Sequence, residues 1–211
     1  MSRRVFYDTE FTDIAPGADL ISIGLVSGDA ELYIEITDCD FGNASEFVHE
    51  NVLPLLGRHS PEKLTRAAAA TRIQVWLNSL RHGDITKELI LVSDSNWDWQ
   101  MLLELYPFVP GRPTWARSQN IVGRLAQNWL ASADREQGFF EALENELQNS
   151  DEQHHALVDA RALSVVFMFF LQSPLLDAVV RKLTYEDDEL MFTRNTLLSD
   201  GENWPEPGET Q

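Results

Sequence analysis

The sequence has few of the features that mark a disulfide-stabilised or membrane-spanning protein. Cys39 is the single cysteine among 211 residues, so neither an intrachain disulfide nor a cysteine-based metal site can form. The longest apolar stretch, residues 162–171, is about half of the roughly 20 residues that span a bilayer. Residues 1–7 lack the apolar segment of a secretory signal. We therefore expect a globular protein of the reducing cytoplasm.

Basic side chains are also scarce. The chain has 16 Lys and Arg against 34 Asp and Glu, a formal net charge of −18. A protein that coats duplex nucleic acid needs a broad basic surface, so the sequence disfavours that class. An enzyme that grips a few nucleotides at one strand end remains compatible with this charge. Residues 199–211 are rich in Gly, Pro and Glu, and we interpret them as a loosely packed acidic tail.

Three apolar runs of strand length come early in the chain, and a turn signal separates the second from the third. The runs are residues 4–8, 20–27 and 31–37, and Ser27-Gly28-Asp29 is typical of a hairpin turn. Residues 88–93 form a nearly unbroken apolar run, which is typical of a parallel strand covered on both faces. The pattern predicts three antiparallel strands followed by a parallel one.

Helical patterns separate and follow these strands. Ser60 and Pro61 resemble an N-cap and a first helical residue, so we expect a helix from there to about Leu80 that crosses over to the fourth strand. Together the elements predict one α/β domain over residues 1–198, a mixed sheet with helices on both faces. The remaining expected elements are helices at 97–105, 119–130, 136–147 and 156–171, and a short fifth strand at 114–116.

Asp8 and Glu10 stand at the end of the first apolar run. Residues two apart in a strand project from one face, so the two carboxylates lie together. Their repulsion disfavours ionisation, and a divalent cation would offset it, since hard cations such as Mg²⁺ prefer carboxylate and phosphate oxygens. Alone, the pair is weak evidence for a metal site, because solvated strand ends often carry such pairs. With further carboxylates it indicates metal-assisted chemistry on a phosphate ester.

Two more carboxylates follow the fourth strand. Asp94 and Asp98 lie where an amphipathic helix begins, and both could reach the face that carries the first pair. An acidic residue in the first turn also complements the helix macrodipole. We rank Asp98 above Asp94 as a metal ligand, although the residues alone leave the choice nearly even.

His154 and Asp159 form the third cluster. Asp159 lies within the helix expected at 156–171, and five helical steps would put His154 on a different face, so we place His154 in the preceding loop. A loop histidine near bound metals suits general-base chemistry because its pKa lies near operating pH. The alternative is an exposed histidine pair, His154 and His155, at a helix N-terminus.

These clusters, taken in order, resemble a known family. The motif Asp8-Thr9-Glu10, the aspartate Asp98 after Asn96-Trp97, and His154 five residues before Asp159 resemble the DEDDh subgroup of DnaQ-like 3′–5′ exonucleases. The resemblance spans roughly residues 4–170 and implies a ribonuclease H-like fold.

A narrower similarity lies in Tyr7–Phe11, Leu20–Gly24 and Trp97–Trp99. These segments resemble the small bacterial and phage 3′–5′ exoribonuclease branch described from mycobacteria. Phe11 departs from the broad family, in which proofreading subunits commonly have Thr, and agrees with this branch.

The resemblance implies a mechanism and a substrate. Asp8, Glu10, Asp98 and Asp159 would hold two Mg²⁺ or Mn²⁺ ions, and His154 would accept a proton from water. The implied enzyme releases nucleoside 5′-monophosphates from single-stranded RNA 3′ ends, and a homodimer is left open. Candidate substrate contacts are Thr9, Phe11 (stacking on the terminal base, or packing in the core), and Arg112, Arg117 and Arg124 (binding phosphates, or solvated surface residues).

Two other functions remain open from the sequence. One is a 3′–5′ exodeoxyribonuclease of repair or recombination, since no residue in the pattern identifies a contact to a 2′-hydroxyl. The other is a catalytically silent nucleic-acid-binding module on the same fold, because fold does not fix function. A silent relative would typically lose one of the five motif residues, and this chain has all five.

Overall fold

The computed structural model of the chain describes residues 3–82, 89–105, 116–120, 145 and 151–171. The chain divides into two compact units, Met1–Phe167 and Met168–Gln211, and the fold and site described below belong to the first. The predicted end of the domain at residue 198 and the acidic tail lie outside the described residues. No helix in the described part of the chain is long and apolar enough to cross a membrane.

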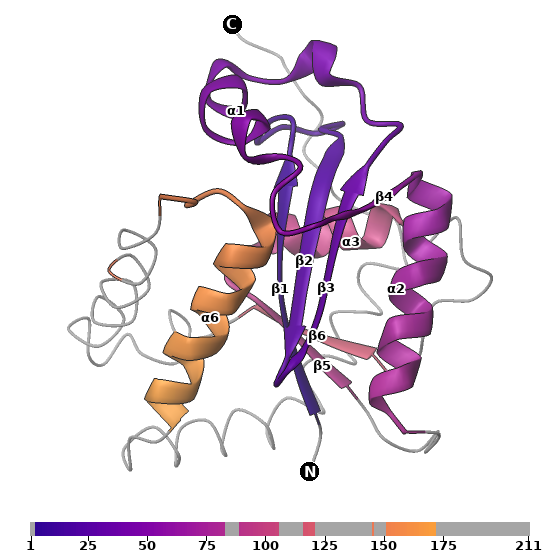
Figure 1. Cartoon of the computed structure of the whole chain (residues 1–211), viewed down its shortest axis with the longest axis vertical. Coiled ribbons are helices and arrows are strands. Elements are labelled where there is room, and N and C mark those ends of the chain that lie inside the picture. The colour runs from indigo at the N-terminus through magenta and orange to yellow at the C-terminus, as the bar shows by residue number, and fades with distance from the viewer. Residues whose placement is uncertain (1–2, 83–88, 106–115, 121–144, 146–150, 172–211) are drawn as a thin grey trace, which may run out of the picture. The chain divides into compact units, whose positions relative to one another are not determined.

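The described strands form one mixed sheet in the order β4-β3-β2-β1-β5-β6 (Figure 1). β1 pairs antiparallel with β2 and β2 with β3, whereas β4, β5 and β6 each join a neighbour in parallel. The predicted antiparallel strands followed by parallel ones are therefore confirmed. The strands are β1 (Arg3–Phe11), β2 (Leu20–Ser27), β3 (Ala30–Ile36), β4 (Glu62–Leu64), β5 (Leu89–Ser93) and β6 (Ala116–Asn120).

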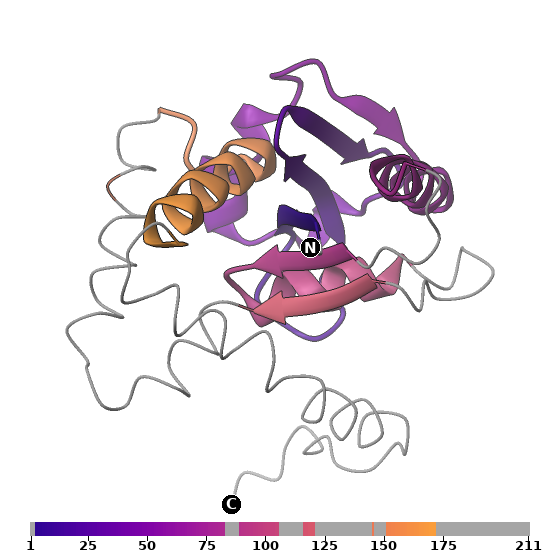
Figure 2. The ribbon, with the colours of Figure 1, turned by 90° about the horizontal axis from the view of Figure 1, so that it is seen from below.

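Helices cover both faces of this sheet, as expected. α2 and α6 flank the strands from opposite sides in two perpendicular views (Figures 1 and 2). α3 contributes to the same hydrophobic cluster as α2. The described helices are α1 (Glu46–Asn51), α2 (Arg66–Leu80), α3 (Asn96–Glu104) and α6 (Ala156–Leu171), with short 3₁₀ turns η1 (Phe41–Asn43) and η2 (Leu53–Leu55).

Alternation along β1 assigns its side chains to the two layers. Val5 and Tyr7 are fully buried in the cluster that α2 and α3 complete. Phe6 points to the other face, where its ring lies 5.2 Å from that of Phe167 on α6. Asp8 and Glu10 share the face of Phe6, because successive strand residues alternate. The two carboxylates therefore lie on the side of the sheet that α6 covers.

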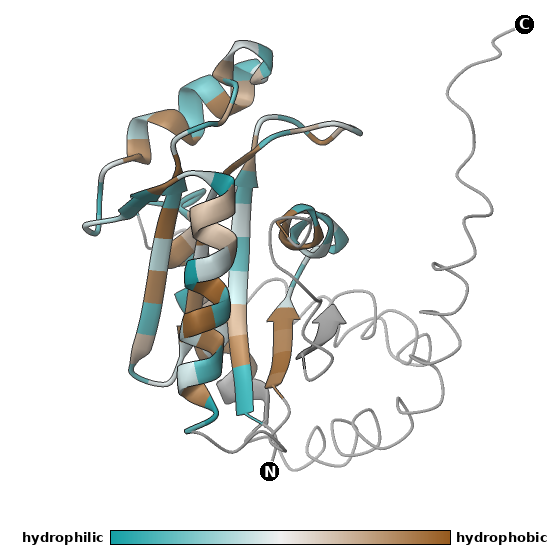
Figure 3. Ribbon diagram, turned by 90° about the vertical axis from the view of Figure 1, so that its right-hand side faces the viewer, coloured by the Kyte–Doolittle hydropathy of each residue, from teal (hydrophilic) through white to brown (hydrophobic). Residues whose placement is uncertain are grey.

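The fourth predicted strand is β5, and it is central. β5 lies between β1 and β6, and Figure 3 shows it as hydrophobic along most of its length. Leu89, Leu91 and Val92 are fully buried. Continuous apolar sequence is typical of a parallel strand covered on both faces, so this prediction is confirmed.

The predicted start of the long helix is wrong. Ser60 does not cap a helix: it has a left-handed φ of 52°, and Glu62–Leu64 pairs with β3 as the edge strand β4. The helix begins at Arg66, after Thr65, whose side chain accepts a hydrogen bond from the Ala68 N–H. A long-range strand pairing overrides the local Ser-Pro signal here. The predicted end at Leu80 is confirmed.

The predicted fifth strand lies later in the chain than expected. β6 covers Ala116–Asn120 and pairs in parallel with the whole of β5. Gln119 and Asn120 therefore belong to a strand, whereas the sequence pattern assigned residue 119 onward to a helix. Pairing with the apolar β5 stabilises an extended conformation in a segment that is itself polar. The helices predicted at 121–130 and 136–147 lie outside the described residues, apart from Asn145, which is helical.

Candidate active site

β1 places the first two carboxylates opposite β2. Asp8 pairs with Gly24 and Glu10 with Ser22 in the antiparallel ladder. Gly24 has a packing role: a Cβ there would lie closer than 3.0 Å to backbone atoms of Ala156 and Leu157. Real Cβ atoms essentially never come so close, so α6 can begin directly over this row of the sheet because residue 24 has no side chain. The glycine brings the first turn of α6 beside Asp8 and Glu10.

Asp98 is held by a capping box at the start of α3. Ser95 is the N-cap, and its backbone N–H donates to Asp98 Oδ2 at 3.2 Å. The backbone N–H and the hydroxyl of Thr9 both donate to Asp98 Oδ1, at 3.1 and 2.7 Å. Asp98 is 1% exposed, and these three hydrogen bonds fix its carboxylate against β1. Asp98 therefore lies against β1, the strand that carries Asp8 and Glu10, as the sequence analysis predicted.

Asp159 and His154 approach from the start of α6. His154 precedes that helix in a turn and has a left-handed φ of 69°, so the predicted loop position is confirmed. Its backbone N–H donates to Asp159 Oδ2 at 3.1 Å, while Asp159 Oδ1 is buried without a hydrogen-bond partner. The His154 ring meets Phe47 of α1 edge-on, 4.9 Å between centroids. A buried carboxylate oxygen with no donor is the kind of atom that a cation would satisfy.

The acidic side chains gather into two groups. Glu10, His154 and Asp159 each offer one ligand atom, all within 4.8 Å of one another, and Asp8, Asp94 and Asp98 do the same. All five predicted site residues are therefore brought together from three distant segments of the chain. Asp94, which the sequence left close to even with Asp98, joins it in the second group.

Burial and mutual repulsion set the protonation of this site. Desolvation, followed by repulsion from Asp98 and Asp159, raises the pKa of Asp8 well above its ordinary value. The pKa of Glu10 is raised for the same reasons, desolvation first and then Asp159. Desolvation also raises the pKa of Asp98 and Asp159. So many buried carboxylates cannot all be ionised without a compensating positive charge.

The residues fit a pair of divalent cations. The donors are carboxylate oxygens, which hard cations prefer, and they form two groups of three within reach of a common ion. Asp159, whose Oδ1 has no hydrogen-bond partner, belongs to the first group. The raised pKa values of Asp8 and Glu10 also indicate that the site lacks a compensating positive charge.

The two predicted substrate contacts lie beside Asp98. Thr9 is 4% exposed, and its hydroxyl is engaged by Asp98, so its side chain holds the carboxylate in place. Phe11 packs against the main core cluster, with its ring 6.2 Å from that of Trp97. Phe11 is only partly buried, so both the core and the stacking interpretations apply to it. Contact of either residue with substrate stays a prediction.

The predicted basic contacts are not tested. Arg112 and Arg124 lie outside the described residues, and Arg117 is placed only as a residue of β6.

The apolar run at residues 162–171 fits either a core helix or a dimer interface by its composition. Ala162, Leu163, Val166 and Phe167 are buried within the chain, whereas Val165 is 54% exposed, which favours the core assignment for this part of the run.

Several neighbours of the site could not be identified from sequence patterns. Phe47 belongs to α1, a helix that the pattern did not predict, and its ring is 53% exposed beside His154. Gly24 lies in the segment Leu20–Gly24, which resembles the exoribonuclease branch, but the sequence does not indicate its packing against α6. Arg58, His59 and Glu152 meet near the turn that carries His154, and only tertiary contact brings them together.

Comparison with known proteins gives a structural likeness. No family model matches the chain, and no curated protein does so either. Among solved structures, the fold is similar to the nuclease domain of 3′hExo, a DEDDh family member determined with bound rAMP. The TM-score is 0.58 at 15% sequence identity, and the match covers 82% of this chain and 93% of that domain. The chain thus has the ribonuclease H-like α/β fold of a DEDDh nuclease domain.

Proposed function

We propose that this chain is a metal-dependent 3′–5′ exoribonuclease that releases nucleoside 5′-monophosphates from single-stranded ends. The observation that carries the proposal is the meeting of Asp8, Glu10, Asp98, His154 and Asp159 in two ligand groups. The likeness of the fold to a DEDDh nuclease domain supports it. These five side chains come in the order and roles that the sequence resemblance implies.

Two Mg²⁺ or Mn²⁺ ions are the proposed cofactors. Asp8, Glu10, Asp98 and Asp159 would hold them, and Asp94 lies close enough to Asp8 and Asp98 to contribute. When bound, the ions supply Lewis-acid stabilisation of the phosphoryl and leaving oxygens and lower the pKa of water. Two bound dications would nearly cancel the negative charge of four carboxylates, which lets an acidic site accept a phosphodiester.

His154 is the proposed general base. Burial lowers the pKa of its imidazole, so the ring is neutral at neutral pH and able to accept a proton. Its ligand atom lies within 4.8 Å of those of Glu10 and Asp159, and this proximity supports the proposed role. The imidazole would take the proton of the attacking water as the phosphodiester is cleaved.

RNA is the proposed substrate, ahead of DNA. The similar nuclease domain of 3′hExo was determined with rAMP, a ribonucleotide. The net charge of −18 favours a short single-stranded end over a long duplex, because duplex binding relies on many basic contacts. Phe11, beside Trp97 at the end of β1, is the proposed stacking residue for the terminal base. Cytoplasmic location and a single domain over residues 1–198 stay predictions.

A gel time course tests the proposal. Single-stranded RNA and DNA of identical sequence, labelled at the 5′ end, are incubated with Mn²⁺, with Mg²⁺ and with EDTA. We expect a ladder that shortens from the 3′ end, faster on RNA, abolished by EDTA and by Asp8→Ala. Faster shortening of DNA would favour the exodeoxyribonuclease. No cleavage of either strand, together with no Mn²⁺ binding by calorimetry, would favour a silent binding module.

A further inference from the structure

The turn that carries His154 is held by an ion-paired carboxylate. Glu152 lies two residues before His154 in the same turn. Its Oε1 accepts a hydrogen bond from Arg58 Nη1 at 3.0 Å, and its Oε2 lies 2.7 Å from His59 Nε2. Both oxygens of one carboxylate are thus engaged by neighbouring residues of the segment after η2. These contacts restrain the turn that carries His154.

The partner segment is itself in a restricted conformation. Gly57, His59 and Ser60 all have left-handed φ values, 87°, 54° and 52°. The N–H of Gly57 donates to the buried carboxylate of Glu35 on β3, which ties the segment to the sheet. Side-chain-bearing residues keep such conformations only where their surroundings enforce them, and such strain clusters at functional sites. His154 is a further residue of this kind, with φ 69°.

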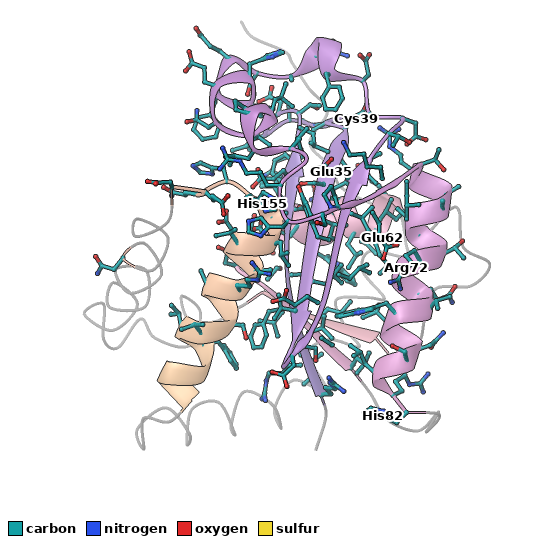
Figure 4. All side chains as sticks on the ribbon, viewed as in Figure 1. Glu35, Cys39, Glu62, Arg72, His82 and His155 are labelled. Carbon is teal, nitrogen blue, oxygen red and sulfur yellow. The ribbon has the colours of Figure 1, made fainter. Side chains whose placement is uncertain are left out.

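His155 adds a second link between the two segments. Its side chain is 1% exposed and lies at the start of α6, on the same side of the sheet as the labelled Glu35 (Figure 4). Its ring lies 4.4 Å from that of Tyr33 and 4.8 Å from that of His59. Packing of His155 between the sheet and His59 leaves the preceding residue, His154, directed towards Glu10 and Asp159.

We propose that Glu152, through its contacts with Arg58 and His59, is a positioning residue that holds His154 where it can act as the general base. The inference rests on the proposed function. Glu152 belongs to neither of the two ligand groups, so its proposed effect on catalysis is through His154. Partly exposed ion pairs contribute little to stability, so the expected role of this one is to fix the geometry of the turn.

The test compares Glu152→Ala with a matched control. Arg72→Ala removes a two-point ion pair with Glu62 that is also partly exposed (Figure 4), but that lies on α2, across the sheet from α6 and the turn. Because a misplaced catalytic group costs up to about 100-fold in rate, we expect kcat on RNA to fall roughly 10- to 100-fold in Glu152→Ala. KM and Mn²⁺ affinity should stay close to wild type, and Glu152→Gln, which keeps one hydrogen bond, should recover part of the loss. Arg72→Ala should leave kcat unchanged.

A double-mutant cycle separates positioning from general destabilisation. If Glu152 acts through His154, Glu152→Ala has no further effect on kcat in a His154→Ala background. An equal loss of kcat in both backgrounds, or no loss in either, would overturn the inference. Either result leaves the proposed function intact as long as the wild-type chain hydrolyses RNA.

Amide hydrogen exchange gives a readout that does not depend on activity. The N–H of His154 donates to Asp159 Oδ2, so its exchange reports the order of the turn directly. We expect faster exchange of residues 151–155 in Glu152→Ala and unchanged exchange in Arg72→Ala. A wild-type chain inactive on RNA and DNA would defeat the proposed function. Unchanged exchange in Glu152→Ala would instead defeat the positioning role.

Discussion

The two ligand groups of the site are built in different ways. Asp8, Asp94 and Asp98 come from β1 and from the β5–α3 junction. There Asp98 accepts three hydrogen bonds, two of them from backbone N–H groups, and is 1% exposed. Glu10, His154 and Asp159 combine the same strand with a turn and the first turn of α6. In the group around His154, Asp159 retains a buried oxygen without a hydrogen-bond partner.

This difference indicates a division of labour within the site. Backbone N–H groups of a strand end and a helix cap preorganise the group around Asp98, so its geometry follows from secondary structure. The group around His154 depends on a turn in a left-handed conformation and on side chains from other segments. Preorganised ligands and a separately positioned base are what hydrolysis requires.

Gly24→Val should have the largest effect. A side chain there meets the backbone of Ala156 and Leu157, so α6 must move away from the sheet and carry Asp159 and His154 with it. Loss of the base and of one ligand, each about 10²-fold or more, predicts a decrease in kcat/KM on the order of 10⁴-fold. Calorimetry with Mn²⁺ should show weakened binding at one of two sites. Val26→Ala, which shortens a residue on the same face, is the control; equal losses in both variants would contradict the explanation.

His154→Ala should remove catalysis while sparing metal binding. General bases contribute roughly 10²- to 10⁴-fold, so we expect kcat to fall about 10³-fold with Mn²⁺ affinity within about twofold of wild type. His49→Ala, an exposed histidine of α1, should change neither quantity. Loss of Mn²⁺ binding in His154→Ala would show that this ring is a ligand and not the base.

Thr9→Val perturbs the preorganised group with little change in shape. The substitution removes the 2.7 Å hydrogen bond to Asp98 Oδ1, and hydrogen bonds to charged groups contribute about 1.5–3 kcal/mol. We expect a loss of stability of about 2 kcal/mol in urea unfolding and roughly tenfold weaker binding of one Mn²⁺ ion. Thr9→Ser keeps the hydroxyl and should behave like wild type. A fully active, metal-saturated Thr9→Val would mean that the backbone hydrogen bonds alone hold Asp98.

The pH dependence of stability tests the packing of His155. Burial, followed by repulsion from His59, lowers the pKa of His155 to about 4, with Glu152 and Glu35 acting in the opposite direction. His155 therefore takes up a proton near pH 6.5 in the unfolded chain but only near pH 4 in the folded chain. Its contribution to stability is fully present above about pH 6.5 and is lost as the pH falls towards 4.

We expect protonation of His155 to lower the free energy of unfolding by about 2 kcal/mol between pH 7.5 and pH 5. His155→Phe keeps a ring between Tyr33 and His59 but cannot titrate. The difference between the urea midpoints of wild type and this variant should therefore change with pH over the window. Parallel curves would place the His155 ring in contact with solvent.

Sequence patterns predicted the structure correctly where it is determined by contacts between residues close in sequence. Period-two alternation put Asp8 and Glu10 on one face, and the helical repeat put His154 before α6 and Asp159 within it. The start of α2 was wrong because Glu62–Leu64 pairs with β3. The segment 116–120 was partly assigned to a helix because nothing local indicates that it pairs with β5. Strand pairing depends on a partner, which a single segment does not encode.

By itself, the sequence determined which side chains with metal-binding and proton-accepting chemistry are present and in what order they follow the strands. Only the tertiary structure decided that Thr9 fixes Asp98, 89 residues away, and that Glu152 reaches His59 across 93 residues. Such contacts depend on the register of the sheet and on the approach of α6 over Gly24. Hydrophobic periodicity specifies which face of an element is buried, whereas the packing of those faces against one another determines which polar groups then meet.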